Sequence, residues 1–197
     1  MKQIEFLFDY GSPFSYLADT QLPALAARTG ARVLYTPILL GGVLKATGNS
    51  SPIAVPAKGR YMSVELKRWA QRYGIAELVN KFFPINTMKL MRGAIASQQL
   101  GLFERYHAVI FPAFWREGLN LGNGEVFTRV IEAGGLPAAE IARASETSEI
   151  KDRLRRNTDD AVARGMFGAP TFFVGDQMYW GNDRLDWVEE AVAKLSS

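Results

Sequence analysis

The sequence predicts a mixed α/β domain in which an all-helical segment interrupts the strands. Residues 3–40 alternate a strand, a helix and a strand, and residues 171–195 supply two short strands and a final helix. Between them, from residue 58 to about residue 134, the hydrophobic periodicity is helical and no strand pattern is convincing. The order of elements is therefore βαβ, a helical insertion, a charged helix, and ββα.

The first unit begins with a strand at residues 3–8, where Ile, Phe and Leu predominate. Pro13 suits the first turn of the helix that follows, and apolar residues then recur at helical spacing until Gly30. Pro23 lacks a backbone donor and predicts a kink inside this helix. Residues 31–40 contain the apolar positions of a second strand, which completes a βαβ unit.

Loops are predicted after the second strand, at the glycines 41 and 42 and at residues 48–52 (GNSSP). The insertion then shows repeated helical patterns, and Pro112 is expected to interrupt one of them. A charged amphipathic helix that ends at Gly165 leads back to the strands. The predicted helices of this part cover residues 62–73, 90–100, 103–115, 126–133, 138–144 and 150–163.

The C-terminal unit is predicted to be a hairpin followed by a helix. Residues 171–174 (TFFV) have the composition of a buried strand, and residues 175–177 (GDQ) form a tight turn. Residues 178–180 return as a second strand. Asn182 or Asp183 is expected to cap a helix that runs from residue 184 to residue 195.

Composition excludes several classes of chemistry. Cysteine is absent, which excludes a disulfide, a thiolate nucleophile of the chain itself, and a Cys-ligated zinc or iron–sulfur site. The single histidine, His107, excludes a multi-His metal site and is expected to have a structural or surface role. The net charge of +3 is spread along the chain, and acids interrupt the basic run at residues 151–156. Such a run is typical of a solvated helix face and not of a nucleic-acid surface.

The chain also lacks the sequence signals of a membrane or exported protein. No apolar run approaches the roughly 18 residues that a membrane span needs. Residues 1–5 begin a strand at once, without the charged and apolar regions of a signal peptide. We therefore expect a cytoplasmic protein with no membrane, nucleic-acid or metal partner.

The turn after the first strand carries the strongest chemical signal. Residues 9–16 (DYGSPFSY) place Ser12 at a helix start, where N–H groups are unpaired and the helix dipole is positive. An anion is stabilised at such a place, and a thiol ionises more easily there. Because the chain has no thiol, we expect Ser12 to donate a hydrogen bond to the thiolate of a bound ligand. The simpler alternative is that Ser12 only caps the helix.

Three separated turns would converge if the strands form one mixed sheet with the insertion on one side. The first is residues 11–13 (GSP), and the second is residues 168–171 (GAPT), where a proline stands at the start of a strand. The third is residues 181–184 (GNDR), a second strand-to-helix turn.

With these turns in this order, the chain resembles the thioredoxin fold, in the branch that carries a helical domain between βαβ and ββα. Within that branch it is similar to the 2-hydroxychromene-2-carboxylate isomerases and to the related kappa-class glutathione transferases, over almost the whole chain. The resemblance implies a thioredoxin-like domain at residues 1–40 and 165–197, and a helical insertion domain at residues 41–164 that includes the connecting helix. The matching motifs are residues 8–17, 48–49, 56–58, 67–70, 83–87, 168–171 and 180–185.

The resemblance implies glutathione as the bound thiol. Ser12 stands where redox relatives carry their first cysteine, so its hydroxyl would donate to the glutathione sulfur. Pro170 matches the family's cis-proline, which would leave the Ala169 backbone free to pair with the cysteinyl backbone of glutathione. The alternative for Pro170 is a plain proline at the start of a strand.

Two more groups of residues match positions that hold the ends of glutathione. Backbone N–H groups at Asn182, Asp183 and Arg184 would take the γ-glutamyl carboxylate, and Asp183 would pair with its ammonium group. Asn49 and Lys58 match positions at the glycyl end, where Lys58 would pair with the carboxylate. The alternatives are a helix cap without a ligand and ordinary polar loop residues.

The pocket for the second substrate is expected between Ser12 and the insertion. Tyr10 and Phe14 are expected as its walls, and Lys45 and Asn86 as partners of a substrate carboxylate. Gly11 departs from the bulkier residue of some relatives, which would change how closely a flat substrate approaches the sulfur. Further aromatic candidates for the walls are Phe83, Trp115 and Trp180.

The resemblance implies a glutathione-dependent isomerase of 2-hydroxychromene-2-carboxylate-type intermediates of aromatic degradation, which works by reversible addition of a thiolate. It also implies a small aromatic or conjugated carboxylate as substrate, and a homodimer. One alternative is a kappa-class-like transferase that leaves glutathione on an electrophile. Another is a non-catalytic module that binds extended peptides. The missing cysteines exclude a disulfide oxidoreductase.

Overall fold

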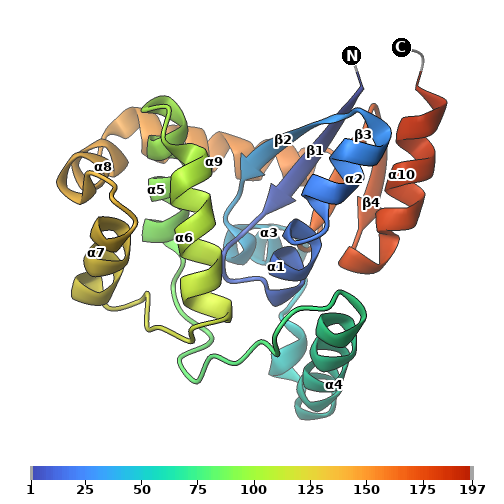
Figure 1. Cartoon of the computed structure of the whole chain (residues 1–197), viewed down its shortest axis with the longest axis horizontal. Helices are drawn as coiled ribbons and strands as arrows, with labels where there is room; N and C mark the ends of the chain where they lie inside the picture. Colours follow the sequence, from blue (N-terminus) through green and yellow to red (C-terminus); the bar gives the residue numbers. More distant parts are fainter. Residues whose placement is uncertain (1, 196–197) are drawn as a thin grey trace.

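The computed structural model describes residues 2–195, and its centre is a four-stranded sheet with the order β2-β1-β3-β4 (Figure 1). Strand β1 (Gln3–Phe8) pairs in parallel with β2 (Arg32–Pro37) and antiparallel with β3 (Thr171–Val174). Strand β4 (Gln177–Trp180) pairs antiparallel with β3. The predicted mixed sheet is therefore confirmed, and the first and last strand units of the chain meet at its centre.

Helices cover the sheet and also form a group beside it, so the predicted helical insertion is confirmed. Figure 1 shows α5, α6, α7 and α8 gathered on one side, whereas α4 stands below the sheet. The helices are α1 (Pro13–Asp19), α2 (Leu22–Thr29), α3 (Leu40–Thr47), α4 (Pro56–Arg72), α5 (Met88–Gln99), α6 (Phe103–Trp115), α7 (Gly124–Ala133), α8 (Ala138–Ser145), α9 (Ser148–Ala163) and α10 (Leu185–Lys194), with the 3-10 helices η1 (Pro52–Ala54) and η2 (Asn182–Arg184).

Both faces of the sheet are buried, which explains why its central strands are almost continuously apolar. On one face, Leu7 of β1 packs in a cluster with Val43 of α3 and Ala161 of α9. On the other face, Phe6 belongs to the main core and stacks on Phe172 of β3 with ring centroids 5.3 Å apart. This core continues into α5 and α6, so the helical group and the sheet are packed together.

The expected single kinked helix after β1 is wrong, because the chain forms two helices, α1 and α2. Pro23 has no N–H to donate to the carbonyl four residues earlier, so a continuous helix cannot pass through it. Instead, α1 ends at Asp19 and α2 begins at Leu22, with Pro23 in its first turn, where no donor is needed.

The expected loop at Gly41 and Gly42 is also wrong, since both residues lie inside α3. Distant side chains support this helix. The Leu40 N–H donates to Asp9 Oδ2 at 2.8 Å, and the Leu39 N–H donates to Thr158 Oγ1 at 3.0 Å. A Cβ at Gly42 would come within 3.2 Å of Thr158 Cγ2. Gly42 therefore permits the close approach of α3 to α9.

Two helix ends differ from expectation as well. The expected interruption at Pro112 is wrong, because α6 continues through it to Trp115, and the N–H groups of Arg116 and Glu117 donate to the Pro112 carbonyl. The C-terminal helix α10 begins at Leu185 without a side-chain cap, because Asn182 and Asp183 form η2 before it. No helix within residues 2–195 is both long and apolar enough to span a membrane.

Candidate active site

Ser12 is buried at the junction of β1 and α1. Its N–H donates to the carbonyl of Asp9 at 2.9 Å, which closes the turn. Its Oγ accepts from the N–H of Ser15 at 3.1 Å and donates to the carbonyl oxygen of Ala169 at 3.1 Å. Ser12 is thus the N-cap of α1 and also a link to the segment before β3.

The three predicted turns do lie together. The first two are joined by the bond from Ser12 to Ala169. The peptide bond between Ala169 and Pro170 is cis. The N–H of Gly181, in the third turn, donates to the carbonyl of Pro170 at 3.0 Å. The first two turns therefore line one cavity, whereas the third turn adjoins them through Pro170 and contributes Asn182 and Asp183 to a separate pocket.

A mostly apolar cavity of about 360 Å³ opens beside Ser12 and Ala169. It extends from the β1–α1 turn to α3, to the loop that follows α3, and to the first turns of α4. Trp180 forms one wall, and its indole lies so close to Gly168 that a Cβ there would be 2.6 Å from Nε1. Besides Ser12 and Ala169, the residues singled out in the sequence that line this cavity include Phe14, Asn49, Lys58, Phe83 and Trp180.

Asn49 and Lys58 provide polar groups at the rim. Asn49 is held by two bonds: its Nδ2 donates to the carbonyl of Phe167 at 2.9 Å, and its Oδ1 accepts from the N–H of Ser50 at 2.8 Å. Lys58 lies in the first turn of α4 and is exposed. The rim therefore offers a fixed amide and an exposed positive charge to an anionic ligand.

Four aromatic or polar candidates for the substrate pocket do not line the cavity. Tyr10 is completely buried in the core, and the buried Trp115 donates from Nε1 to the carbonyl of Tyr10 at 2.7 Å. Lys45 is exposed on α3, and Asn86 is exposed before α5, where its Oδ1 accepts from the N–H of Met88. The expected substrate contacts of Tyr10 are contradicted by its burial, because a wall residue needs an accessible side chain.

Asp9 is a buried residue of the site that the sequence argument missed. Its Oδ1 accepts from the N–H of Gly11 at 2.8 Å, and its Oδ2 accepts from the N–H of Leu40 at 2.8 Å and from Thr87 Oγ1 at 3.0 Å. Burial raises the pKa of the Asp9 carboxyl, while these three donors oppose the rise. The carboxyl joins the Ser12 turn to α3 and to the residue before α5. In the sequence, the signal that could have identified Asp9 as a site residue is its position directly after β1, at the start of the motif at residues 9–16.

Gly11 packs tightly against Thr87, which is a second feature that the sequence did not reveal. A Cβ at Gly11 would lie 2.8 Å from Thr87 Cγ2, well inside normal contact. Gly11 also lines the cavity next to Ser12. The absence of a side chain at this position therefore fits the structure around it, because a side chain would meet Thr87 and Asp9.

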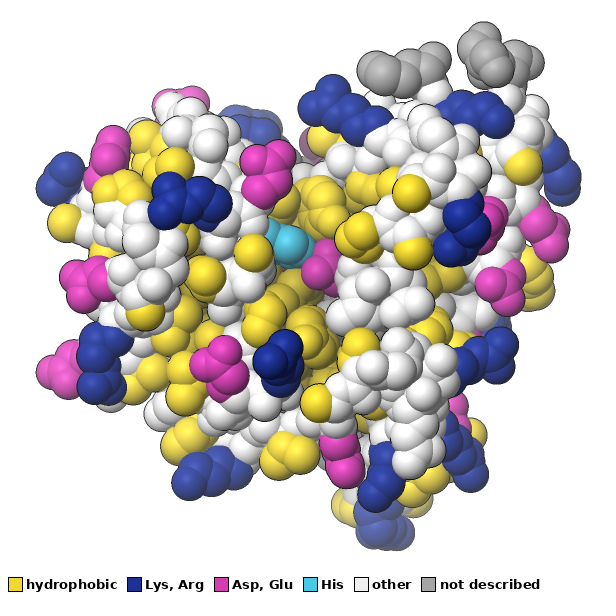
Figure 2. Space-filling view, viewed as in Figure 1, with side chains coloured by type: hydrophobic (Ala, Val, Ile, Leu, Met, Phe, Trp, Pro, Cys, Tyr) yellow, Lys and Arg dark blue, Asp and Glu magenta, His cyan; other side chains and the backbone are white. Residues whose placement is uncertain are grey.

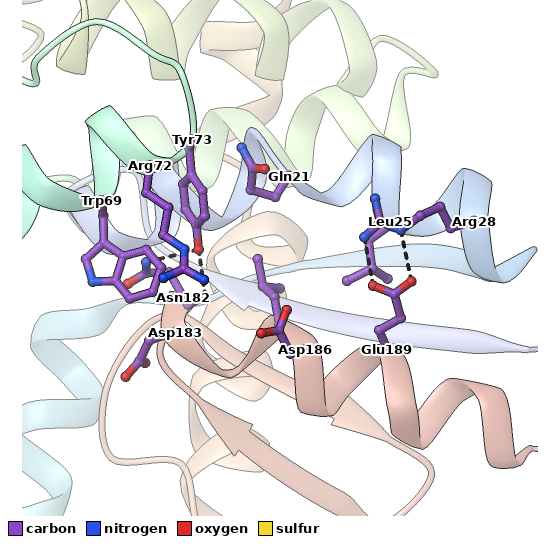
Figure 3. Close-up of a pocket in the computed structure, with 11 residues that line it drawn as sticks. Gln21, Leu25, Arg28, Trp69, Arg72, Tyr73, Asn182, Asp183, Asp186 and Glu189 are labelled. Carbon is purple, nitrogen blue, oxygen red and sulfur yellow. Dashed lines mark hydrogen bonds and ion pairs between the residues drawn. The ribbon is translucent and has the colours of Figure 1, made fainter.

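A second, polar pocket of about 100 Å³ lies at η2, between α2, α4 and α10 (Figure 3). Asn182 is buried there and forms two bonds with the Tyr73 hydroxyl. Tyr73 Oη donates to the Asn182 carbonyl at 3.0 Å, and Asn182 Nδ2 donates to Tyr73 Oη at 3.3 Å. Asp183 points into solvent and forms an ion pair with Arg184. Figure 3 shows Arg72 and Trp69 of α4 above Asn182 and Asp183, so the third turn faces a charged rim.

His107 has the structural environment that was expected for it. Its Nδ1 is 3.0 Å from Tyr10 Oη, and its Nε2 is 2.9 Å from Asp19 Oδ1, at the end of α1. Figure 2 shows this imidazole, the only one in the sequence, at the floor of a hollow. The hollow lies between the helical group on the left and the sheet with its helices on the right. It does not line the cavity beside Ser12.

The fold and the site define a class of protein. The sheet order and the helical insertion fit a thioredoxin-like domain. The family of the DSBA-like thioredoxin domain matches residues 3–193, so the chain belongs to that family.

Within this class, the chain belongs to the family of 2-hydroxychromene-2-carboxylate isomerases, as the resemblance predicted. The 2-hydroxychromene-2-carboxylate isomerase of Pseudomonas putida is 35% identical over 196 residues, which cover 98% of this chain and 95% of the relative. A solved structure of a 2-hydroxychromene-2-carboxylate isomerase has a TM-score of 0.87 and 35% identity, with 98% of this chain and 95% of that chain covered. Glutathione S-transferase kappa 2 of Caenorhabditis elegans is more distant, at 27% identity over 98% of this chain and 92% of the relative. The predicted membership of an isomerase family is therefore confirmed.

Proposed function

We propose that this chain is a glutathione-dependent isomerase that acts on 2-hydroxychromene-2-carboxylate or a closely similar conjugated carboxylate of aromatic degradation. The observation that carries the proposal is the position of the Ser12 hydroxyl, on the wall of a mostly apolar cavity and beside the backbone of Ala169. The chain has no cysteine, so the reactive sulfur must come from a ligand. The names of the relatives supply the reaction and the substrate class.

The residues around the cavity fit a peptide thiol such as glutathione. Ala169 offers backbone polar groups next to Ser12, directly before β3, which suits a short peptide that pairs as an added strand. Asn49 and Lys58 at one rim suit the glycyl carboxylate. At η2, Asn182 and Asp183 suit the γ-glutamyl end, and Arg184 stands beside them as the present partner of Asp183. Asp183 must therefore leave or share this ion pair when it binds an ammonium group.

The chemistry divides between the ligand and the chain. When bound, glutathione supplies a thiolate that adds reversibly to the conjugated substrate, so that a double bond becomes a rotatable single bond before the thiolate departs. The Ser12 hydroxyl provides a hydrogen bond to the sulfur anion and so favours the thiolate over the thiol. Phe14, Phe83 and Trp180 provide apolar walls for a flat ring. Lys58 adds a positive charge that favours anionic ligands.

A kappa-class-like transferase is the second candidate. The glutathione S-transferases among the relatives favour it, and the same sulfur site would serve a reaction in which glutathione stays on the electrophile. The two functions differ in the fate of glutathione. The resemblance also implies a homodimer, which light scattering after size exclusion would test, and the pattern of residues 1–5 carries the expectation of a cytoplasmic location.

The test is turnover of 2-hydroxychromene-2-carboxylate by the purified chain, with and without glutathione, followed by chromatography of all thiol species. The proposal expects isomer formation only with glutathione, and full recovery of free glutathione. Accumulation of a stable conjugate would establish the transferase instead. If the chain neither turns over the substrate nor is stabilised against heat by glutathione, both the isomerase and the transferase are contradicted. The remaining alternative is then the non-catalytic module that binds extended peptides.

A further inference from the structure

The backbone of Tyr10 is held by side chains of the helical group. Its carbonyl accepts from Trp115 Nε1 of α6 at 2.7 Å, and its N–H donates to Met91 Sδ of α5 at 3.3 Å. Within residues 2–195, neither backbone group has another hydrogen-bond partner. Because sulfur is a weak acceptor, the bond from the indole is the stronger of the two. Trp115 therefore fixes a carbonyl that the sheet and α1 leave unpaired.

The carbonyl that Trp115 holds belongs to the peptide unit between Tyr10 and Gly11. The N–H of Ser12 donates to the carbonyl of Asp9 at 2.9 Å, so this peptide unit lies in the middle of the turn that presents Ser12. At the opposite edge of the same unit, the N–H of Gly11 donates to Asp9 Oδ1 at 2.8 Å. Glycine has few steric limits on its dihedral angles, so the unit can rotate when either bond is absent. The two bonds together set the direction in which the chain reaches Ser12.

The same indole also packs against a wall of the cavity. The rings of Trp115 and Phe83 have centroids 5.2 Å apart and an interplanar angle of 53°. Phe83 lines the cavity, whereas Trp115 is buried and does not. The ring of Trp115 thus supports the wall, while its N–H holds the turn that carries Ser12. A test of the N–H must therefore keep a ring at this position.

We infer that Trp115 is a positioning residue for the sulfur site, because its indole N–H holds the Tyr10–Gly11 peptide unit and so directs the Ser12 hydroxyl toward the ligand. Trp115 acts through Ser12 and does not touch the ligand itself. When this bond is absent, the turn gains freedom, and the hydroxyl stabilises a bound thiolate less. The inference rests on the proposed function and deepens it, because it names the group that keeps the hydroxyl in place.

The test measures the pKa of bound glutathione from the ultraviolet absorbance of its thiolate across a pH series. Trp115→Phe removes the N–H and keeps an aromatic ring. A second protein carries at residue 115 a tryptophan analogue in which sulfur replaces the indole N–H. This analogue keeps the full ring against Phe83, so the N–H is tested even if the smaller ring prevents folding. Both changes are also combined with Ser12→Ala.

Two control variants remove neighbouring hydroxyl groups that have no part in the inference. Tyr106→Phe, also in α6, deletes a buried hydroxyl that donates to the carbonyl of Leu90 at 2.8 Å, outside the turn. It therefore reports the effect of losing a buried bond to the backbone without a change at Ser12. Ser15→Ala is the control for Ser12→Ala. Its buried Oγ has no hydrogen-bond partner within the described residues, and its N–H still donates to Ser12 Oγ.

We expect Ser12→Ala to raise the bound thiol pKa by about one unit, a tenfold loss of thiolate, which is the size of one net hydrogen bond. Loss of the N–H at residue 115 is expected to raise it by about half a unit, a threefold loss of thiolate, when Ser12 is present. In the Ser12→Ala background, the same change is expected to have less than about a third of this effect, since the two residues act as a unit. Tyr106→Phe and Ser15→Ala are expected to leave the pKa unchanged.

Two results would overturn the positioning role while the proposed function stands. One is a lower Tm without a shift of the thiol pKa after loss of the N–H at residue 115, which would show a purely structural role. The other is an equal shift with and without Ser12, which would show that Trp115 does not act through the hydroxyl. No binding of glutathione to the wild-type chain would instead overturn the proposed function, and the inference with it.

Discussion

Replacing Gly11 by alanine tests the packing beside Ser12. The new Cβ would lie 2.8 Å from Thr87 Cγ2, whereas carbon atoms pack best at about 3.5–4.0 Å. Thr87 is buried, and its Oγ1 is bonded to Asp9 Oδ2 at 3.0 Å, so it cannot rotate away without losing that bond. The backbone of Gly11 does not have a positive φ, so the effect is one of space alone.

The magnitude follows from these contacts. Overpacking of this kind destabilises the folded state by roughly 1–3 kcal/mol. Alanine also lowers the entropy of the unfolded chain, which stabilises the folded state by about 0.4–1 kcal/mol. We expect Gly11→Ala to reduce the free energy of unfolding by about 1–2 kcal/mol, or to lower the Tm by about 2–8 °C for a chain of this size. Gly124→Ala is the matched control, because a Cβ there meets nothing within 4 Å.

A compensating variant tests the contact between residue 11 and Thr87 directly. Thr87→Ser removes only the Cγ2 that clashes and keeps the hydroxyl for Asp9, at a loss of about 0.8 kcal/mol for the methyl group. In the double variant Gly11→Ala/Thr87→Ser, the clash is absent, so the two single effects should not add. Urea unfolding of all four proteins measures this coupling. Additivity within about 0.5 kcal/mol would refute the assigned contact.

Three further outcomes are expected. Lys58→Met should weaken glutathione binding about 2- to 10-fold in calorimetry, with less difference at high salt, while Lys45→Met, away from the cavity, should not. Asp183→Ala should raise the Kd for glutathione with little change in kcat at saturation; a loss confined to kcat would contradict a binding role. Tyr73→Phe removes the hydroxyl that bonds the backbone and side chain of Asn182, and should destabilise the chain by about 1–3 kcal/mol in urea; an unchanged midpoint would show that these bonds are not formed.

Much of the fold was predictable because its signals are local. The apolar strands at both ends of the chain and the helical periodicity between them needed no knowledge of distant contacts. The same is true of the three turns around Ser12, Ala169 and Gly181, whose convergence follows once the strands form one sheet. The matching motifs then pointed to the family.

The errors arose where distant groups decide the local structure. Helix α3 forms despite Gly41 and Gly42, because Asp9 and Thr158 bind the N–H groups at its start. The sequence carries no local sign of that support. Asp9 itself was missed for the same reason, since two of its three donors come from Leu40 and Thr87, far away in the chain.

Aromatic residues near a predicted site were another source of error. Tyr10 adjoins Gly11 in the sequence, but its side chain points into the core, where its hydroxyl contacts His107. Phe14, only four residues later, does line the cavity. Pattern alone cannot separate these two cases, because both residues are aromatic and both flank the Ser12 turn.

The central claim is that Ser12 keeps an imported sulfur ionised. The pH dependence of kcat at saturating glutathione tests it most directly, since the acid limb of that profile reports a group of the bound complex. We expect the acid limb of Ser12→Ala to move to higher pH by about one unit relative to the wild type and to Ser15→Ala. An acid limb at the same pH in all three proteins would contradict the role of Ser12.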